Sequence, residues 1–193
     1  RHVFSAVDPL GVRVTSFKAP TPAELAHDYL WRVHPHVPGN GEIVIFNRSH
    51  YEDVLIVRVH EWISKATCEA RYRHINEFER MLTDTGTTII KCFLHISKDA
   101  QKARLEERLK DKDKNWKFNV GDLDERKLWD RYVDAYERAI RATSTKWAPW
   151  YVIPADSKTN RNLAISRLLV ETLESLKLRH PDPAPGLENI VVE

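Results

Sequence analysis

Short apolar runs alternate with longer amphipathic stretches along almost the whole chain. The short runs, rich in β-branched residues, predict strands at residues 12–17, 42–46, 87–96 and 150–153. The longer stretches predict helices at residues 21–33, 71–82, 97–112, 122–143 and 160–178. Because a helix separates each strand from the next, we predict an α/β fold with a parallel sheet and helices on both of its faces.

Capping signals and apolar faces support several of these helices. Thr21, Pro22 and Glu24 occupy the N-cap, the first helical position and the third helical position of a capping box. Gly86 predicts the end of helix 71–82, because glycine readily adopts the left-handed conformation common at helix ends. Ser97 is the predicted N-cap of helix 97–112. The faces predicted to point inward contain Ile75, Phe78 and Leu82, then Trp129, Tyr132, Val133, Tyr136 and Ile140, then Leu169, Leu173 and Leu176.

Composition limits the classes of protein to which the chain can belong. Its 193 residues, 42% of them hydrophobic, suffice for one domain with a core. The formal net charge is only +2, which argues against nucleic acid as a partner. No apolar run reaches the roughly 20 residues of a membrane span, and no signal peptide opens the chain. Cys68 and Cys92 stand singly, which predicts reduced thiols and a cytoplasmic location without a membrane partner.

The loop after strand 42–46 gathers polar side chains. Residues 47–53 offer an amide, a guanidinium, a hydroxyl, a phenol and two carboxylates. In open α/β sheets, ligands bind at the carboxyl ends of the strands. Arginine can hold phosphate oxygens there, and a carboxylate can hold Mg²⁺. These residues alone fit a phosphoryl-transfer site and a solvated strand-to-helix turn equally well.

Two further basic features fit either a phosphate-binding site or ordinary solvated surface. Lys18 follows the first strand and precedes a helix N-terminus, where anions bind, but an ordinary surface lysine also fits. Residues 98–128 form a highly charged excursion in which Arg104 and Arg108 share a helix face. The charged run within it fits a solvated helix, yet that run ends in Asn-Trp-Lys-Phe at 115–118, and solvation alone does not explain the aromatic Trp116.

Three stretches of the chain resemble the polyphosphate kinase 2 family. Residues 42–55, which contain Asn-Arg-Ser-His-Tyr-Glu-Asp, resemble its Walker B region, and Lys-Ala-Pro-Thr at 18–21 resembles the loop after its second strand. Residues 104–117, with the pattern R-x-x-x-R-x-x-D-x-x-K-x-W-K, resemble its lid. Asn47 stands where many members have Asp, and this form resembles the class III branch, which accepts both AMP and ADP.

The resemblance implies a fold and an activity. The fold is a P-loop-kinase-like three-layer sandwich, with a helical lid at about 98–128 and a Pro-rich tail at 180–193, all in one domain spanning 1–193. The activity is polyphosphate-dependent phosphorylation of AMP to ADP and of ADP to ATP, in either direction, by a homodimer or homotetramer. The resemblance assigns catalysis to Asn47, Arg48, Glu52 and Asp53, Mg²⁺ or Mn²⁺ binding to Asp53 and then Glu52, and phosphate binding to Lys18, Arg48, Arg58, Arg104, Arg108, Lys114 and Lys117.

One part of such an enzyme is not found in the sequence. A kinase of this kind needs a glycine-rich Walker A loop followed by Lys, and none of the six glycines begins one. We therefore expect that loop to precede Arg1. Two other functions remain open: an ATP-dependent nucleoside monophosphate kinase, and an inactive module that binds polyphosphate or nucleotide.

Overall fold

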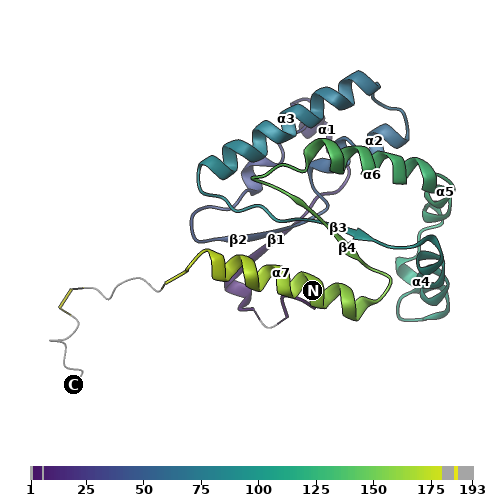
Figure 1. The fold of residues 1–193 in the computed structure, drawn as a ribbon. Helices are drawn as coiled ribbons and strands as arrows, with labels where there is room; N and C mark the ends of the chain where they lie inside the picture. The colour runs from purple at the N-terminus through teal and green to yellow at the C-terminus, as the bar shows by residue number, and fades with distance from the viewer. Residues whose placement is uncertain (1, 6, 180–184, 187–193) are drawn as a thin grey trace.

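The computed structural model describes residues 2–5, 7–179 and 185–186, and Figure 1 shows their arrangement. The strands are β1 (Val12–Ser16), β2 (Ile43–Asn47), β3 (Lys91–His95) and β4 (Trp150–Pro154). The α-helices are α1 (Pro22–Leu25), α2 (Ile56–Val59), α3 (Lys65–Asp84), α4 (Lys98–Lys110), α5 (Gly121–Lys127), α6 (Trp129–Thr143) and α7 (Lys158–Ser175). All four predicted strands and all five predicted helices have counterparts, although several bounds differ.

The strands pair in parallel, as predicted, but in two separate pairs. β1 pairs with β2, with Val12 opposite Ile43, and β3 pairs with β4, with Lys91 opposite Trp150. Within the described residues no backbone pairing joins one pair to the other, so the single sheet that we predicted is seen as two. Each strand uses one edge for its partner and leaves the other edge unpaired.

Helices lie on both sides of the strands. In Figure 1, α3 and α6 lie on one side and α7 on the other, while α4 and α5 extend from one end. α3 packs against α6, and the main core lies beneath them. This core consists of Tyr51, Val54, Leu55, Val59, Cys68, Tyr72, Ile75, Ala135 and Ala139. A smaller cluster of Phe17, Val33 and Phe78 lies beside β1 and β2. Buried side chains from the loop after β2 therefore belong to the main core.

The first helix is much shorter than predicted. The capping box is confirmed, since the Thr21 hydroxyl accepts the Glu24 N–H at 3.3 Å and the Glu24 carboxylate accepts the Thr21 N–H at 2.6 Å. The helix nevertheless ends at Leu25. Three residues later Asp28 Oδ1 accepts the backbone N–H groups of Leu30 and Trp31, at 2.9 and 3.0 Å. This side chain starts a new turn and competes with continued helix.

Helix α3 is longer than its predicted counterpart at residues 71–82. It begins at Lys65, and Ser64 caps it by accepting the Thr67 N–H at 3.0 Å. Its first turns contain a single buried side chain, Cys68, which is too little apolar periodicity to reveal a helix from sequence. Gly86 follows its end with a φ of 99°, which confirms the predicted left-handed stop.

The two C-terminal helical predictions need correction in their inward faces. Helix 122–143 is divided at Leu128 into α5 and α6. α6 buries Ala135, Ala139 and Thr143. Of the predicted face, Tyr132 and Tyr136 pack against the core, whereas Val133 is 48% exposed. The small side chains on α6 let it pack against α3. A prediction from apolar periodicity favours large side chains and therefore overlooks these small ones. α7 has no buried residue, and Leu173 and Leu176, predicted to face inward, are exposed. The predicted tail at 180–193 lies almost entirely outside the described residues.

Two predictions from composition can be compared with the structure. Cys68 and Cys92 are both free thiols, as predicted, and Cys68 is buried. None of the helices in the described ranges has the length and apolar content needed to span a bilayer.

Candidate functional site

The site begins where β2 ends, in residues 47–53, which we call the β2 loop. Asn47 is the last residue of β2, and its Nδ2 donates to Ser16 Oγ on β1 at 3.2 Å. The two residues are also partners in the strand register. Asn47 thus joins the carboxyl ends of the two strands, so the chain segments after β1 and after β2 leave the sheet side by side.

Arg48 has an unusual backbone conformation. Its φ is 61°, in the left-handed region that non-glycine residues seldom occupy, and its side chain is exposed. Within the described residues its guanidinium forms no ion pair or hydrogen bond. The next residue, Ser49, accepts the Tyr51 N–H on its hydroxyl at 3.3 Å and opens the short 3-10 helix His50–Asp53. Strained conformations of this kind concentrate at functional sites, where the surrounding structure maintains them.

The two carboxylates of the β2 loop are partly buried. Burial raises the pKa of Glu52, an effect that the Arg48 charge opposes and the Asp53 charge reinforces. Burial also raises the pKa of Asp53, against the opposing charges of Arg32, Arg71 and His50. Asp53 Oδ2 is buried without a hydrogen bond, 3.6 Å from Arg32 Nη2. An acceptor oxygen left in this state is available to a cation.

Arg32 and Arg71, which the sequence analysis missed, surround Asp53. Arg32 is 7% exposed and donates from Nη1 to the Lys18 carbonyl at 2.9 Å, so it links the end of β1 to the β2 loop. Arg71 Nη1 donates to the Asp53 carbonyl at 2.7 Å, and its guanidinium lies 4.6 Å from the Tyr29 ring centre. Both arginines fall in predicted helices, where a lone Arg usually indicates a solvent-facing position. Only tertiary contacts distinguish them.

The structure brings Lys18 but not Arg58 to this edge of the sheet. Lys18 follows β1 as Arg48 follows β2, and its side chain is exposed. Arg58 lies on α2, where its charge assists Arg138 in lowering the pKa of Asp134 on α6. No hydrogen bond or ion pair among the described residues joins the Arg58 side chain to the β2 loop.

Residues 98–128, the lid segment, form α4, a 3-10 turn at Asn115–Lys117 and α5, none of which has a buried residue. Ser97 caps α4 as predicted, by accepting the Ala100 N–H at 3.1 Å. Arg104 donates from Nη2 to the carbonyls of Ala155, at 2.5 Å, and Asp156, at 2.9 Å. The guanidinium of Arg104 therefore attaches α4 to the loop after β4.

The other cations of the lid segment have weak, exposed partners. Arg108 Nη1 lies 3.7 Å from Asp122 Oδ2, and Lys114 pairs with Asp111. Lys117 Nζ lies 4.8 Å from the centre of the Trp116 ring, and Trp116 is 74% exposed. Exposed pairs of this kind contribute little energy, so a polyanion could replace these partners at low cost.

Two hollows border these elements. One, of about 440 Å³, is lined by Asp28, Leu30, Trp31, His34 and Pro35, on the segment that carries Arg32. The other, of about 280 Å³, lies at the carboxyl ends of β3 and β4 and includes His95, Ser97, Asp156 and Asn160 in its lining. The second hollow thus borders the loop after β4, to which Arg104 is bonded.

A metal ion could bind to the β2 loop only with help from a substrate. Within the described residues no group of three or more His, Cys, Asp or Glu side chains converges on one point. Mg²⁺ commonly takes one or two protein carboxylates together with water and substrate phosphates. Asp53, whose Oδ2 faces Arg32 without a hydrogen bond, and neighbouring Glu52 fit that requirement.

Comparison with known proteins identifies the family of the chain. The family model described as Polyphosphate kinase 2 matches residues 1–181. The chain belongs to the polyphosphate kinase 2 family. A relative from Meiothermus ruber, an AMP/ADP-polyphosphate phosphotransferase, is 61% identical over 193 residues, which is all of this chain and 72% of that protein. An ADP-polyphosphate phosphotransferase from Rhodopseudomonas palustris is 46% identical over 96% of this chain and 68% of its own length.

A solved member of the polyphosphate kinase 2 family has nearly the same backbone. The crystal structure of Polyphosphate Kinase 2 from Arthrobacter aurescens TC1 superposes with a TM-score of 0.95 at 50% sequence identity. The match covers 97% of this chain and 66% of that one. The mixed α/β architecture with parallel strands is therefore that of the family, and the chain spans about two thirds of the length of this member.

Proposed function

We propose that this chain transfers a phosphoryl group between inorganic polyphosphate and AMP or ADP, on a P-loop-kinase-like scaffold with Mg²⁺ bound at the site. The observation that carries the proposal is the β2 loop, in which an exposed arginine in a left-handed conformation adjoins two partly buried carboxylates. The names of the relatives from M. ruber and R. palustris support polyphosphate as donor and AMP or ADP as acceptor.

In the proposed reaction, the bond between the terminal phosphorus of polyphosphate and its bridging oxygen breaks, and a terminal phosphate oxygen of AMP or ADP bonds to that phosphorus. The bridging oxygen keeps the electron pair and leaves as the new end of the shortened polyphosphate. Arg48 holds oxygens of the transferring group, and the exposed Lys18 neutralises a neighbouring phosphate. Asp53 and Glu52 hold Mg²⁺, which when bound offsets charge on the phosphates. Arg32 and Arg71 hold Asp53 in place from behind, through the contacts described above. Electrostatic stabilisation and positioning supply most of the rate in phosphoryl transfer.

The lid segment completes the proposed site. Arg108, Lys114 and Lys117 hold polyphosphate in place of their present surface partners, and closure of the segment excludes water, so that phosphate passes to the nucleotide. Arg104 has a different part here, because its bonds to the loop after β4 make it the attachment of the segment.

The decisive experiment varies donor and acceptor separately. The full-length protein is incubated with AMP or ADP, Mg²⁺ and either polyphosphate or ATP, and the nucleotides are separated by chromatography. We expect ADP from AMP and ATP from ADP with polyphosphate, and no product when EDTA removes the metal. Product from AMP with ATP alone would identify an ATP-dependent kinase. Binding of polyphosphate without turnover would identify an inactive module.

A further inference from the structure

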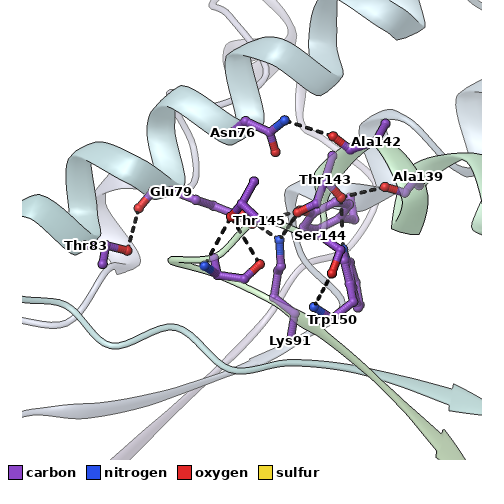
Figure 2. A network of polar contacts seen from close by, with 12 residues as sticks. Asn76, Glu79, Thr83, Lys91, Ala139, Ala142, Thr143, Ser144, Thr145 and Trp150 are labelled. Carbon is purple, nitrogen blue, oxygen red and sulfur yellow. Dashed lines mark hydrogen bonds and ion pairs between the residues drawn. The ribbon is translucent and has the colours of Figure 1, made fainter.

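A charged network lies buried between the strands and α3, and it includes two residues that nothing in the sequence pattern singled out. Figure 2 shows Lys91 extending from β3 toward Glu79 on α3 and Thr143 at the end of α6. Lys91 is 7% exposed and Glu79 is 1% exposed. Lys91 Nζ donates to Glu79 Oε2 at 2.6 Å and to the Thr143 carbonyl at 2.8 Å. Because burying both charges costs desolvation, such a pair seldom stabilises a fold better than apolar side chains would.

The network reaches the β2 loop through Tyr51. The Tyr51 hydroxyl accepts from Lys91 Nζ at 2.9 Å and donates to Glu79 Oε1 at 2.8 Å. Lys91 therefore has three acceptors, one for each proton of its ammonium group. The Tyr51 ring is 4% exposed and packs edge-on against Trp150, with ring centres 4.7 Å apart. The hydroxyl has its donor and its acceptor capacity both in use.

Burial and the Glu79 charge both favour the protonated form of the Tyr51 hydroxyl. Burial raises the pKa of Tyr51, and the Glu79 charge raises it further. Burial lowers the pKa of Lys91, while Glu79 opposes that change. His50 also faces Glu79, with Nε2 3.5 Å from Oε1 but without a hydrogen bond. The phenol can therefore donate to Glu79 throughout the neutral range.

Tyr51 also organises the backbone of the β2 loop. Its carbonyl accepts the N–H groups of Val54 and Leu55, both at 3.0 Å, and its own N–H donates to Ser49 Oγ at 3.3 Å. Displacement of this one residue would move the loop on both sides of it. The loop contains a left-handed arginine, which needs such support because its conformation is intrinsically unfavourable.

We propose that Tyr51, Glu79 and Lys91, the anchor triad, are positioning residues that hold the β2 loop in the geometry needed for phosphoryl transfer. The triad contacts no substrate and acts through Arg48 and Asp53. This proposal rests on the function proposed above. It assigns the buried ion pair a part in turnover, beyond packing.

The test compares two variants that each lose one buried hydroxyl. Tyr51→Phe removes the hydroxyl of the triad and keeps the ring. Thr143→Val, the control, removes the hydroxyl that accepts from Trp150 Nε1 at 2.9 Å and donates to the Ala139 carbonyl at 2.6 Å. It leaves the backbone carbonyl of residue 143 to accept from Lys91. Amide hydrogen exchange over residues 48–55 is measured by mass spectrometry, and kcat and KM are measured with polyphosphate and AMP, well below the melting temperature of each variant.

In Tyr51→Phe we expect at least about tenfold faster exchange in the β2 loop and at least about tenfold lower kcat, with both KM values within about twofold of the parent. Thr143→Val should retain parental loop exchange and kcat at a similar loss of Tm. The proposal fails if Tyr51→Phe leaves either loop exchange or kcat at the parental value, or if the control changes both as much. A parent protein inactive with polyphosphate would refute the proposed function, and the exchange data would still show whether the hydroxyl anchors the loop.

Discussion

The β2 loop and the lid segment both carry the charges expected of a phosphate site, but the two regions are held in opposite ways. The β2 loop is attached to the core by a buried ion pair and by the buried arginine Arg32. The lid segment has no buried side chain in its helical elements, and two of its cations, Arg108 and Lys114, pair with acids at the surface. The buried contacts fix a geometry, whereas the exposed ones can be exchanged for those of a ligand.

This difference follows from the energetics of charge in the two environments. An exposed ion pair contributes about 0 to 1 kcal/mol, so its partners separate readily when a polyanion arrives. A buried charge that loses its partner costs several kcal/mol, so its geometry is hard to disturb. We infer that the β2 loop sets the rate of the proposed phosphoryl transfer and that the lid segment sets the affinity for polyphosphate.

The largest expected effect is on turnover at the β2 loop. Arg48→Ala should lower kcat by about a thousandfold or more, as loss of an arginine that stabilises transferring phosphate does. Arg13→Ala is the matched control. Arg13 lies near the start of β1, at the end of the strands opposite to the β2 loop, and pairs with exposed Glu42 at 3.3 Å. Steady-state kinetics would measure both.

A third variant separates chemistry from folding. Arg48→Gly relieves the positive φ and should have at least the parental Tm while remaining as inactive as Arg48→Ala. If either Arg48 variant turned over at more than a tenth of the parental rate, Arg48 would have only a structural part in the loop.

An intermediate effect is expected on stability. Lys91→Met leaves Glu79 buried without its ammonium partner and should lower the free energy of unfolding by about 3 to 5 kcal/mol. Lys114→Met removes an exposed partner of Asp111 and should change it by less than about 1 kcal/mol. Urea denaturation followed by circular dichroism would measure both. Equal losses in the two variants would contradict the contrast between buried and exposed pairs.

The smallest expected effect is on affinity for polyphosphate. Replacing Arg108, Lys114 or Lys117 singly with Gln should raise the KM for long polyphosphate severalfold and weaken its dependence on salt, because a polyanion gains from each cation along its path. The KM for AMP or ADP should change less. Lys65→Gln, outside the lid segment and paired with Glu69 at 3.9 Å, is the control. Unchanged polyphosphate KM values and salt responses in all three variants would leave the segment as ordinary solvated surface.

Local features of the fold could be read directly from the sequence. Ser97 and Gly86 mark helix boundaries through short-range hydrogen bonding and backbone conformation, and both predictions are confirmed. The strand positions followed from runs of β-branched residues. The lengths of α1 and α3 did not, because they depend on the Asp28 turn and on a weakly apolar first turn.

In the candidate site, too, the features that depend on neighbouring residues could be predicted and those that depend on distant segments could not. Residues 47–53 could be predicted because their functional groups are contiguous in the chain and follow a strand. The supports of that loop could not, since Lys91 lies 40 positions from Tyr51 and Arg71 lies 18 positions from Asp53. In sequence, each of these charged residues has the pattern of a solvated helix or strand position.

The sequence by itself therefore determined the order of strands and helices and the helix caps, and it predicted a candidate phosphate loop at residues 47–53, because each depends on residues close together in the chain. Only the tertiary structure decided that Glu79, Lys91 and Arg32 are buried and paired. Burial of a charge depends on whether a partner from a distant segment repays its desolvation, and no local pattern encodes that balance.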